Sequence, residues 1–376
     1  MAGLLTYQPF KAIYALLAAA FEAARFPLWI LLYISSSGRP HKKWTLRQAI
    51  GVRIIRQFVY HSAAVEVVTP YNLKPGSEKE RFVTCEPAPG SMYKGPLQDK
   101  QIKPLTTGGT WTPKPITPAE IETGNIDVVL HFHGGAYVLG DGRDADTSFL
   151  AKTLLKHARV THVFTPNYRL SCNAGGRFPA AFQDAVTCYY HLVKTLKIPS
   201  DRITISGDSA GGNLAFALLR YLTEYGKDVG LPLPGCAWFW SPWVNVEEAR
   251  NPEALHNSKQ YSTDYLTAPF AMWGARMFAP LDQGLDTTSP YITPIGHPFM
   301  TPVPIWVSTG RAEVLYDDNK AIAEQFEKLG NKVSLHVIDN VPHDIILLGH
   351  ILGFTREAAA AAKNAGEFLQ AERARL

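Results

Sequence analysis

RITISGDSAGGNL, at residues 202–214, is the stretch that decides the fold. Its first part, RITIS, is an apolar run typical of a buried strand, and the residues after the glycines continue into a helical pattern. Between them stands GDSAG, a G-x-S-x-G match whose glycines permit the strained turn that exposes a serine hydroxyl. The match alone is weak evidence, and a glycine-rich turn with an incidental serine is the alternative. Its position between a strand and a helix predicts a nucleophile elbow centred on Ser209.

Strands alternate with helices on both sides of this stretch. We expect strands at 126–132, 159–166, 202–206, 235–240, 304–310 and 333–339, and helices at 146–157, 179–196, 210–224, 317–329 and 354–371. Strands separated by helices of this length predict an α/β fold, with a mostly parallel sheet covered by helices on both faces. Catalytic groups of such a sheet belong at the carboxyl ends of its strands.

A second glycine-rich motif, HGGA at residues 133–136, directly follows the first core strand. Its glycines leave backbone N–H groups free to approach an oxyanion, which the tetrahedral intermediate of acyl transfer requires. We expect Gly135 and Ala136 to donate, with Gly134 shaping the loop. The N–H group of Ala210, directly after the serine, completes this oxyanion hole.

The general base should be a histidine late in the chain, because enzymes with this elbow order their triad serine, acid, histidine. His343 directly follows the last predicted strand, whereas His336 lies inside that strand and His350 lies in a predicted helix. A histidine suits the role because its pKa lies near neutrality. We expect His133 to hold its loop by hydrogen bonds and His131 to be a strand residue without a chemical role.

Three carboxylates are candidates for the catalytic acid, and all follow the strand at 304–310. Glu313 lies in the turn at the carboxyl end of that strand, where it can reach His343. Asp317 and Asp318 fall at the start of the next helix, where acidic residues serve as caps. We predict Glu313 as the acid, with Asp317 as the first alternative and Asp318 as the second.

These motifs resemble the hormone-sensitive-lipase group of α/β-hydrolases, also called the α/β-hydrolase-3 family. The similar segments are HGGA (133–136), NYRL (167–170), FPAA (178–181), GDSAGGNL (207–214), SPW (241–243) and SPYITP (289–294). The resemblance covers about residues 126–350 and implies an α/β-hydrolase fold with an N-terminal and an inserted helical cap. It also implies an esterase or lipase that needs no metal and no cofactor. Membrane-attached deacetylases of this family are similar in having an apolar N-terminus.

The chain departs from the family pattern at three places. Ala136 replaces the third glycine of the usual HGGG, but it keeps the N–H group that the oxyanion needs. The family pattern Asp-Pro-Leu-x-Asp aligns its catalytic aspartate with Glu313, whose side chain is one methylene longer, and its second aspartate with Asp317. After NYRL the chain has SCNAGGR instead of the family's Ala-Pro-Glu run, which puts that loop but not the triad in doubt.

Residues 1–65 are predicted to form an N-terminal cap or anchor region, and residues 66–376 a catalytic domain with a cap insertion at about 242–302. The insertion is long, aromatic and poor in strand patterns. Residues 94–123 are rich in Pro, Gly, Thr and Lys, which predicts a surface excursion before the core begins.

Residues 12–34 are mostly apolar and long enough to span a bilayer. Glu22 and Arg25 would be costly at bilayer depth, and Pro27 would kink a helix. Three interpretations remain: a membrane anchor or in-plane helix, a cap helix that buries its apolar face on the domain, or a cleaved targeting segment. We expect a membrane-associated protein, such as one of the endoplasmic reticulum, or a cytoplasmic one.

A basic cluster follows this segment, and its members are Arg39, His41, Lys42, Lys43, Arg47, Arg53 and Arg56. If the segment spans, the cluster places the catalytic domain in the cytoplasm, and if the segment lies flat, the cluster meets anionic lipid. The third interpretation of the cluster is a solvated helix face.

The composition excludes several classes of function. The net charge is only +4, and no basic run with interleaved aromatic residues occurs, so we expect no nucleic-acid partner. The four cysteines form no CxxC pair, which disfavours zinc and redox sites and favours scattered thiols over disulfides. The sequence does not determine the oligomeric state.

Together the motifs predict a serine-dependent carboxylic-ester hydrolase. Its expected partner is a small-molecule ester, with a short- to medium-chain acyl group on a bulky apolar alcohol. An amidase or arylformamidase would use the same triad on a C–N bond. A non-enzymatic receptor on the same fold is the alternative from another class, although such receptors tend to lose a triad member.

Overall fold

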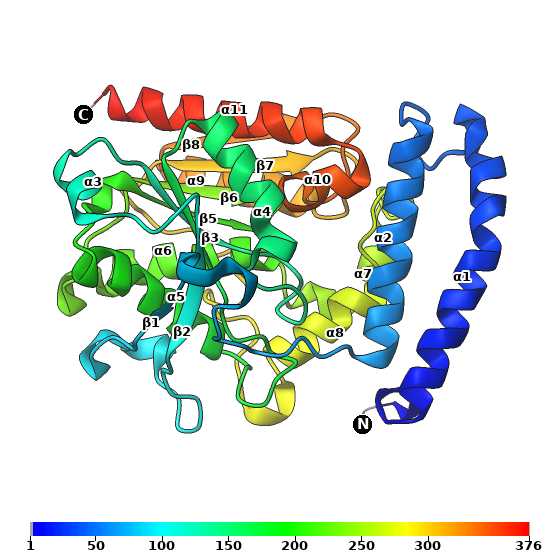
Figure 1. Cartoon of the computed structure of the whole chain (residues 1–376), viewed down its shortest axis with the longest axis horizontal. Helices are drawn as coiled ribbons and strands as arrows, with labels where there is room; N and C mark the ends of the chain where they lie inside the picture. Colours follow the sequence, from blue (N-terminus) through cyan, green and yellow to red (C-terminus); the bar gives the residue numbers. More distant parts are fainter. Residues whose placement is uncertain (1–2, 376) are drawn as a thin grey trace.

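The computed structural model describes residues 3–375 and is built around an eight-stranded sheet with the strand order β1-β2-β4-β3-β5-β6-β7-β8 (Figure 1). The strands are β1 (Phe82–Cys85), β2 (Thr107–Thr112), β3 (Val128–Phe132), β4 (His162–Pro166), β5 (Ile203–Asp208), β6 (Cys236–Trp240), β7 (Ile305–Gly310) and β8 (Val333–Ile338). Neighbours from β4 to β8 pair in parallel, whereas β1 pairs antiparallel with β2 and β2 antiparallel with β4. The predicted α/β fold with a mostly parallel sheet is confirmed.

Helices cover both faces of this sheet and form a separate pair at one end of the molecule. They are α1 (Phe10–Ile34), α2 (Leu46–Val65), α3 (Pro118–Glu122), α4 (Asp144–Thr153), α5 (Ala180–Tyr190), α6 (Ser209–Val229), α7 (Pro252–His256), α8 (Ala268–Phe278), α9 (Tyr316–Lys328), α10 (Ile345–Leu352) and α11 (Thr355–Arg373). Helices α7 and α8 lie between β6 and β7 in the chain, where the cap insertion was expected. The division of the chain into domains stays a prediction.

Side chains along the central strands alternate between two apolar cores. Leu130 and Phe239 belong to the core that also contains residues of α5, α6 and α9. Val129 and Trp238, their neighbours in the sequence, belong to the other core, with residues of α4, α10 and α11. Because both faces are buried, the strands have continuous apolar sequences instead of alternating ones.

Strand β2 corrects the expectation that residues 94–123 form a surface excursion. All residues of β2 are buried, and the strand joins β1 to the rest of the sheet. The sequence did not indicate this strand because two of its residues are glycines, which weaken a strand interior. A Cβ atom on Gly108 would lie 2.7 Å from the Phe82 ring, and one on Gly109 would lie 2.5 Å from the Phe164 ring. Tertiary packing of these rings therefore fills the space that a side chain would occupy.

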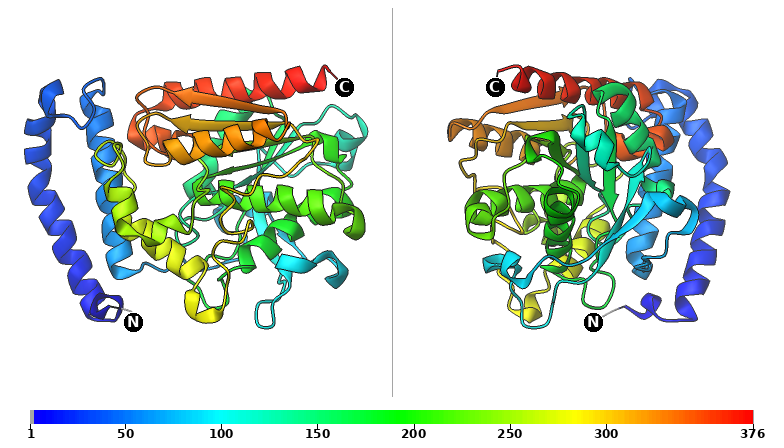
Figure 2. Two further views of the ribbon diagram at one scale, coloured as in Figure 1. Left: turned by 180° about the vertical axis from the view of Figure 1, so that it is seen from behind. Right: turned by 60° about the vertical axis from the view of Figure 1, so that its left-hand side comes forward.

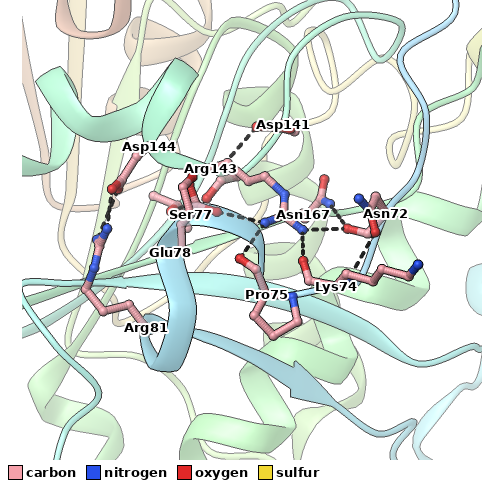
Figure 3. Close-up of polar contacts among 12 residues, drawn as sticks. Asn72, Lys74, Pro75, Ser77, Glu78, Arg81, Asp141, Arg143, Asp144 and Asn167 are labelled. Atoms are coloured by element: carbon pink, nitrogen blue, oxygen red, sulfur yellow. Dashed lines mark hydrogen bonds and ion pairs between the residues drawn. The ribbon is translucent and has the colours of Figure 1, made fainter.

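The irregular segment before β1 is attached to the core by Arg143, which directly precedes α4 (Figure 3). Its Nη1 donates to the carbonyl oxygen of Pro75 at 3.0 Å and to Glu78 Oε2 at 2.8 Å. Its Nη2 donates to the carbonyl oxygens of Lys74 at 2.6 Å and Asn72 at 2.9 Å. One guanidinium thus supplies the donors that a loop without strand partners needs.

Helices α1 and α2 form a hairpin at one end of the molecule, with α1 outermost and α2 facing α8 and α10 (Figures 1 and 2). Within α1 only Trp29 and Tyr33 are buried. The cap-helix interpretation requires the apolar face of α1 to be buried on the catalytic domain. The structure does not place it there. Pro27, where a kink was expected, lies inside the helix and does not end it. By length and composition α1 is able to cross a membrane.

Candidate active site

Ser209 lies at a sharp turn between β5 and α6. Its φ of +50° is in the left-handed region, which is rare for a residue with a side chain and is a mark of strain at functional sites. The flanking glycines allow the turn because no larger residue fits. A Cβ atom on Gly207 would lie 2.1 Å from the Gly211 carbonyl oxygen, and one on Gly211 would lie 1.9 Å from that of Phe132. The predicted elbow geometry is thus present around Ser209.

The loop after β3 brings free backbone donors to this turn. Within residues 3–375, the N–H groups of Gly135, Ala136 and Ala210 donate no hydrogen bond to the protein. Ala210 lies in the first turn of α6, where N–H groups lack a partner in the helix. Gly134 packs tightly on the residue before Ser209, since a Cβ atom there would lie 2.3 Å from Asp208 Oδ2. Its position fits a residue that shapes the loop.

His133 holds this loop, as expected. Its Nδ1 donates to the carbonyl oxygen of Gly134 at 2.7 Å, and its ring stacks on Tyr168 with centroids 4.4 Å apart. The Tyr168 hydroxyl in turn donates to the His133 carbonyl oxygen at 2.6 Å. On the other side, the ring of Tyr137 stacks on Phe278 of α8 at 3.8 Å. The inserted region therefore packs directly on the loop that carries the free donors.

Glu313 and His343 meet at the carboxyl ends of β7 and β8. Glu313 Oε2 lies 3.3 Å from His343 Nδ1, and both side chains are buried. The other carboxylate oxygen of Glu313 accepts from the Thr309 hydroxyl and, at 3.0 Å, from Asn319 Nδ2. These contacts fix the carboxylate on one side and leave the other side for the imidazole.

Burial lowers the pKa of the His343 imidazole, but hydrogen bonding and the charge of Glu313 more than offset this, so the pKa lies above its ordinary value. Asp317 and Asp318 are in the first turn of α9, where they face the amino end of a helix. The structure thus places Glu313, and neither of the two aspartates, beside the histidine.

A buried carboxyl pair connects the serine turn to the histidine loop. Asp208, directly before Ser209, and Asp344, directly after His343, are both buried, and the charge of Asp208 acts on Asp344. Burial raises the pKa of Asp208 to about 6 and raises that of Asp344 well above its ordinary value. A like charge nearby disfavours the ionised form, so the Asp208 carboxylate contributes to the raised pKa of Asp344.

His131 supports this pair from within β3. Its Nε2 lies 2.8 Å from Asp208 Oδ1 and its Nδ1 lies 2.9 Å from the Ser206 hydroxyl. Burial lowers the pKa of His131 to about 3, so the ring is a neutral hydrogen-bonding group. His131 is thus a strand residue, as expected, and its hydrogen-bond partners on the neighbouring strand β5 are not visible in the sequence.

Asp264, in the inserted region, is a further buried carboxylate that sequence reasoning missed. It accepts the backbone N–H of Val314, 50 residues away, and that of His343, 79 residues away. No local pattern indicates contacts over such separations. Among residues 3–375 no cluster of three His, Cys, Asp or Glu side chains could hold a metal ion. The four cysteines, which all lie in this range, are free thiols.

Comparison with known proteins agrees with this architecture. The family model of the alpha/beta hydrolase fold, Abhydrolase_3, matches residues 129–347. An acetyl-hydrolase of Streptomyces hygroscopicus is 30% identical over 61% of this chain and 71% of its own length. An ethyl acetate hydrolase of Pseudomonas putida is 30% identical over 60% of this chain and 67% of its own. The crystal structure of an esterase from the bacterial hormone-sensitive lipase family aligns with a TM-score of 0.61 at 22% identity, covering 88% of this chain and 99% of that one. The chain therefore belongs to the α/β-hydrolase-3 family and has the alpha/beta hydrolase fold.

Proposed function

We propose that this carboxylic-ester hydrolase uses Ser209 as its nucleophile, His343 as its general base and Glu313 as the acid that orients the base. One observation carries the proposal: a serine in a left-handed turn lies at the same sheet edge as a buried glutamate–histidine pair. Since strands β5, β6, β7 and β8 are parallel neighbours, the loops after them converge on one site.

In the proposed reaction the Ser209 hydroxyl attacks the ester carbonyl carbon while His343 takes its proton. The carbonyl oxygen becomes an oxyanion, which accepts hydrogen bonds from the N–H groups of Gly135, Ala136 and Ala210. The intermediate then expels the alcohol, which takes the proton back from the imidazolium. Water enters, His343 removes its proton, and the same steps release the carboxylic acid and restore Ser209.

Glu313 has two tasks in this scheme. It accepts the Nδ1–H of His343, which directs the other nitrogen toward the serine, and it stabilises the imidazolium that forms. Only neutral His343 can act as a base. The pKa of His343 is raised, so the imidazole becomes protonated at a higher pH than an ordinary histidine does. We therefore expect kcat/KM to decrease, as the pH is lowered, already above the ordinary histidine pKa.

The proposed substrates are short- to medium-chain esters, acetates in particular, of a bulky apolar alcohol. The names of the Streptomyces and Pseudomonas relatives favour a short acyl group. An aromatic side chain beside the proposed base favours an apolar alcohol, since the Tyr265 ring lies 5.6 Å from that of His343.

The decisive variant is Ser209→Ala. We expect kcat to fall by several orders of magnitude with substrate binding largely kept, because only the attacking oxygen is removed. A fluorophosphonate probe should label the wild-type protein at Ser209 and leave the variant unlabelled. Turnover by the purified variant at the wild-type rate would overturn the mechanism. Assaying an acetate ester and the matching acetamide of one aromatic group separates esterase from amidase activity.

We also propose that α1 attaches the protein to a membrane surface. Its apolar side chains face outward, with Leu16 73% and Leu31 67% exposed. Two of its charged residues are paired: Glu22 lies 3.1 Å from His61 of α2 and accepts from Arg25 at 3.2 Å. An apolar surface of this kind is stabilised when lipid covers it.

A further inference from the structure

The turn at residues 261–266, between α7 and α8, carries a carboxylate that accepts backbone N–H groups from both loops that hold the proposed acid–base pair. Asp264 is completely buried. Its Oδ2 accepts the N–H of Val314, next to Glu313, at 2.7 Å, and its Oδ1 accepts the N–H of His343 at 3.3 Å. One side chain thus bridges the loop after β7 and the loop after β8.

A second contact from the same turn reaches the acid loop. The Thr263 hydroxyl donates to the carbonyl oxygen of Ala312, directly before Glu313, at 2.9 Å. The backbone on both sides of Glu313 is therefore held by residues of the inserted region. Because a catalytic carboxylate acts only at the right distance from its histidine, these bonds bear on the chemistry.

The turn itself is held by Arg56 of α2. Its Nη1 donates to the carbonyl oxygens of Tyr261 at 2.8 Å, Asp264 at 2.6 Å and Leu266 at 3.2 Å. The guanidinium also lies over the Tyr261 ring, 4.3 Å from its centroid. Arginine is suited to this task because its donors have a fixed planar arrangement. A residue of the N-terminal hairpin therefore shapes the turn that presents Asp264.

We propose that Asp264, held in place by Arg56, is a positioning residue that sets the alignment of Glu313 with His343. The inference rests on the proposed function. It assigns to α2 a part in catalysis that does not require contact with substrate. The coupling is a chain of hydrogen bonds, from α2 through the turn to the two catalytic loops.

Asp264 also adds a negative charge near the imidazole. The titratable side chains that face His343 are those of Glu313, Asp264, Asp344 and Tyr265. Burial raises the pKa of Asp264 to about 6, while the neighbouring imidazolium favours its ionised form. Near neutral pH Asp264 is thus a carboxylate that stabilises protonated His343. Removing this charge lowers the pKa of His343, and the acid limb of the kcat/KM profile then moves to lower pH.

The test compares the full-length variants Asp264→Asn and Asp99→Asn with p-nitrophenyl acetate as the substrate. Asp99 is the control, because its carboxylate also accepts backbone N–H groups, those of Gln101 and Ile102, but at another place. We expect Asp264→Asn to lose about 10- to 100-fold in kcat with little change in KM. Its acid limb should move to lower pH by about one unit, whereas that of Asp99→Asn should not move.

A second comparison uses the variants Arg56→Gln and Arg39→Gln, the latter as the control. Arg39 donates to the carbonyl oxygens of Tyr33, Ile34 and Trp44, so it has the same chemistry but does not touch the turn. We expect a lower kcat for Arg56→Gln than for Arg39→Gln at equal KM. If Asp264→Asn does not fold, as circular dichroism would show, this pair decides.

An acid limb in folded Asp264→Asn that coincides with that of the control, or equal kcat in the two arginine variants, overturns the positioning role. Ser209→Ala separates the two proposals. If it keeps wild-type turnover, the proposed function fails, and if it is inactive while Asp264→Asn behaves like its control, only the positioning role fails.

Discussion

Two glutamate–histidine pairs lie in different regions of this molecule. Glu313 and His343 meet at 3.3 Å at the edge of the sheet, and Glu22 and His61 meet at 3.1 Å between α1 and α2. The first pair is shut off from solvent, with side chains at most 1% exposed, whereas those of Glu22 and His61 are 15% and 23% exposed. Residue types and distances alone therefore do not distinguish the two pairs.

Their surroundings do distinguish them. The second ring nitrogen of His61 is occupied by the Tyr14 hydroxyl at 2.8 Å, so both nitrogens serve the hairpin. The proposed base His343 is engaged at Nδ1 by Glu313 and lies at the sheet edge that carries Ser209. In the hairpin the pair satisfies polar groups between apolar helices, because a buried polar group without a partner is costly. At the sheet edge we propose that the glutamate orients the histidine as a proton acceptor.

The largest effect is expected from disrupting the Glu313–His343 pair. We expect Glu313→Gln to lower kcat/KM by roughly 10²–10⁴-fold, because the amide neither fixes the Nδ1–H tautomer nor stabilises the imidazolium. Asp317→Asn, in the first turn of α9, is the matched control and should keep near-normal kcat/KM. A large loss in Asp317→Asn together with a near-normal Glu313→Gln would reverse the assignment of the acid. It would leave the roles of Ser209 and His343 unchanged.

Two truncations test the helices of the N-terminal hairpin, α1 and α2, one at a time. Removing residues 1–65 deletes α2, which packs on α8 and α10 and carries Arg56, so we expect an unstable or inactive protein. Removing residues 1–38 deletes α1 but keeps α2, and we expect a folded enzyme with near wild-type kcat. That shorter protein should lose binding to liposomes or its need for detergent. Fractionation and kcat measurements on both truncations test this. Loss of activity in the shorter truncation, with unchanged partitioning, would count against the membrane proposal.

The smallest effect is expected from disrupting the Glu22–His61 pair. Glu22→Gln weakens the contact with His61 and removes the charge that pairs with Arg25. Because the hairpin pair and the sheet edge share no residue, kcat should stay within about twofold of wild type. Hydrogen exchange of α1 should nevertheless become faster, since a typical hydrogen bond stabilises by about 1 kcal/mol. A drop in kcat comparable to that of Glu313→Gln would show that the two regions are not independent.

Much of the fold and of the candidate site could be predicted because their signals are local. The alternation of strands with helices places the core strands, and the glycines around Ser209 predict the turn. Strand β2 was missed, since Gly108 and Gly109 lack strand propensity and are filled by rings from β1 and β4.

The basic cluster after α1 is a further case in which tertiary contacts, which the local sequence does not show, decide the role of residues. Arg39 donates to three carbonyl oxygens near its own position, and Arg56 donates to three carbonyl oxygens in a distant turn. The guanidinium of Arg53 lies over the Trp29 ring, 5.0 Å from its centroid. From the sequence, this cluster is a topology signal beside a spanning segment, a lipid-facing patch or a solvated helix face. The structure assigns these three to internal contacts instead.

By itself the sequence determined the α/β class, the serine turn and the histidine and glutamate that follow the last two core strands. Each of these depends on residue type and spacing within a short window, where local sterics and the order of elements decide the outcome. Only the tertiary structure decided that Asp264 bridges the loops after β7 and β8 and that Arg56 holds the turn that carries Asp264. Buried polar groups must find partners wherever the chain brings them, and contacts across 79 residues, like that from His343 to Asp264, exist only once the chain has folded.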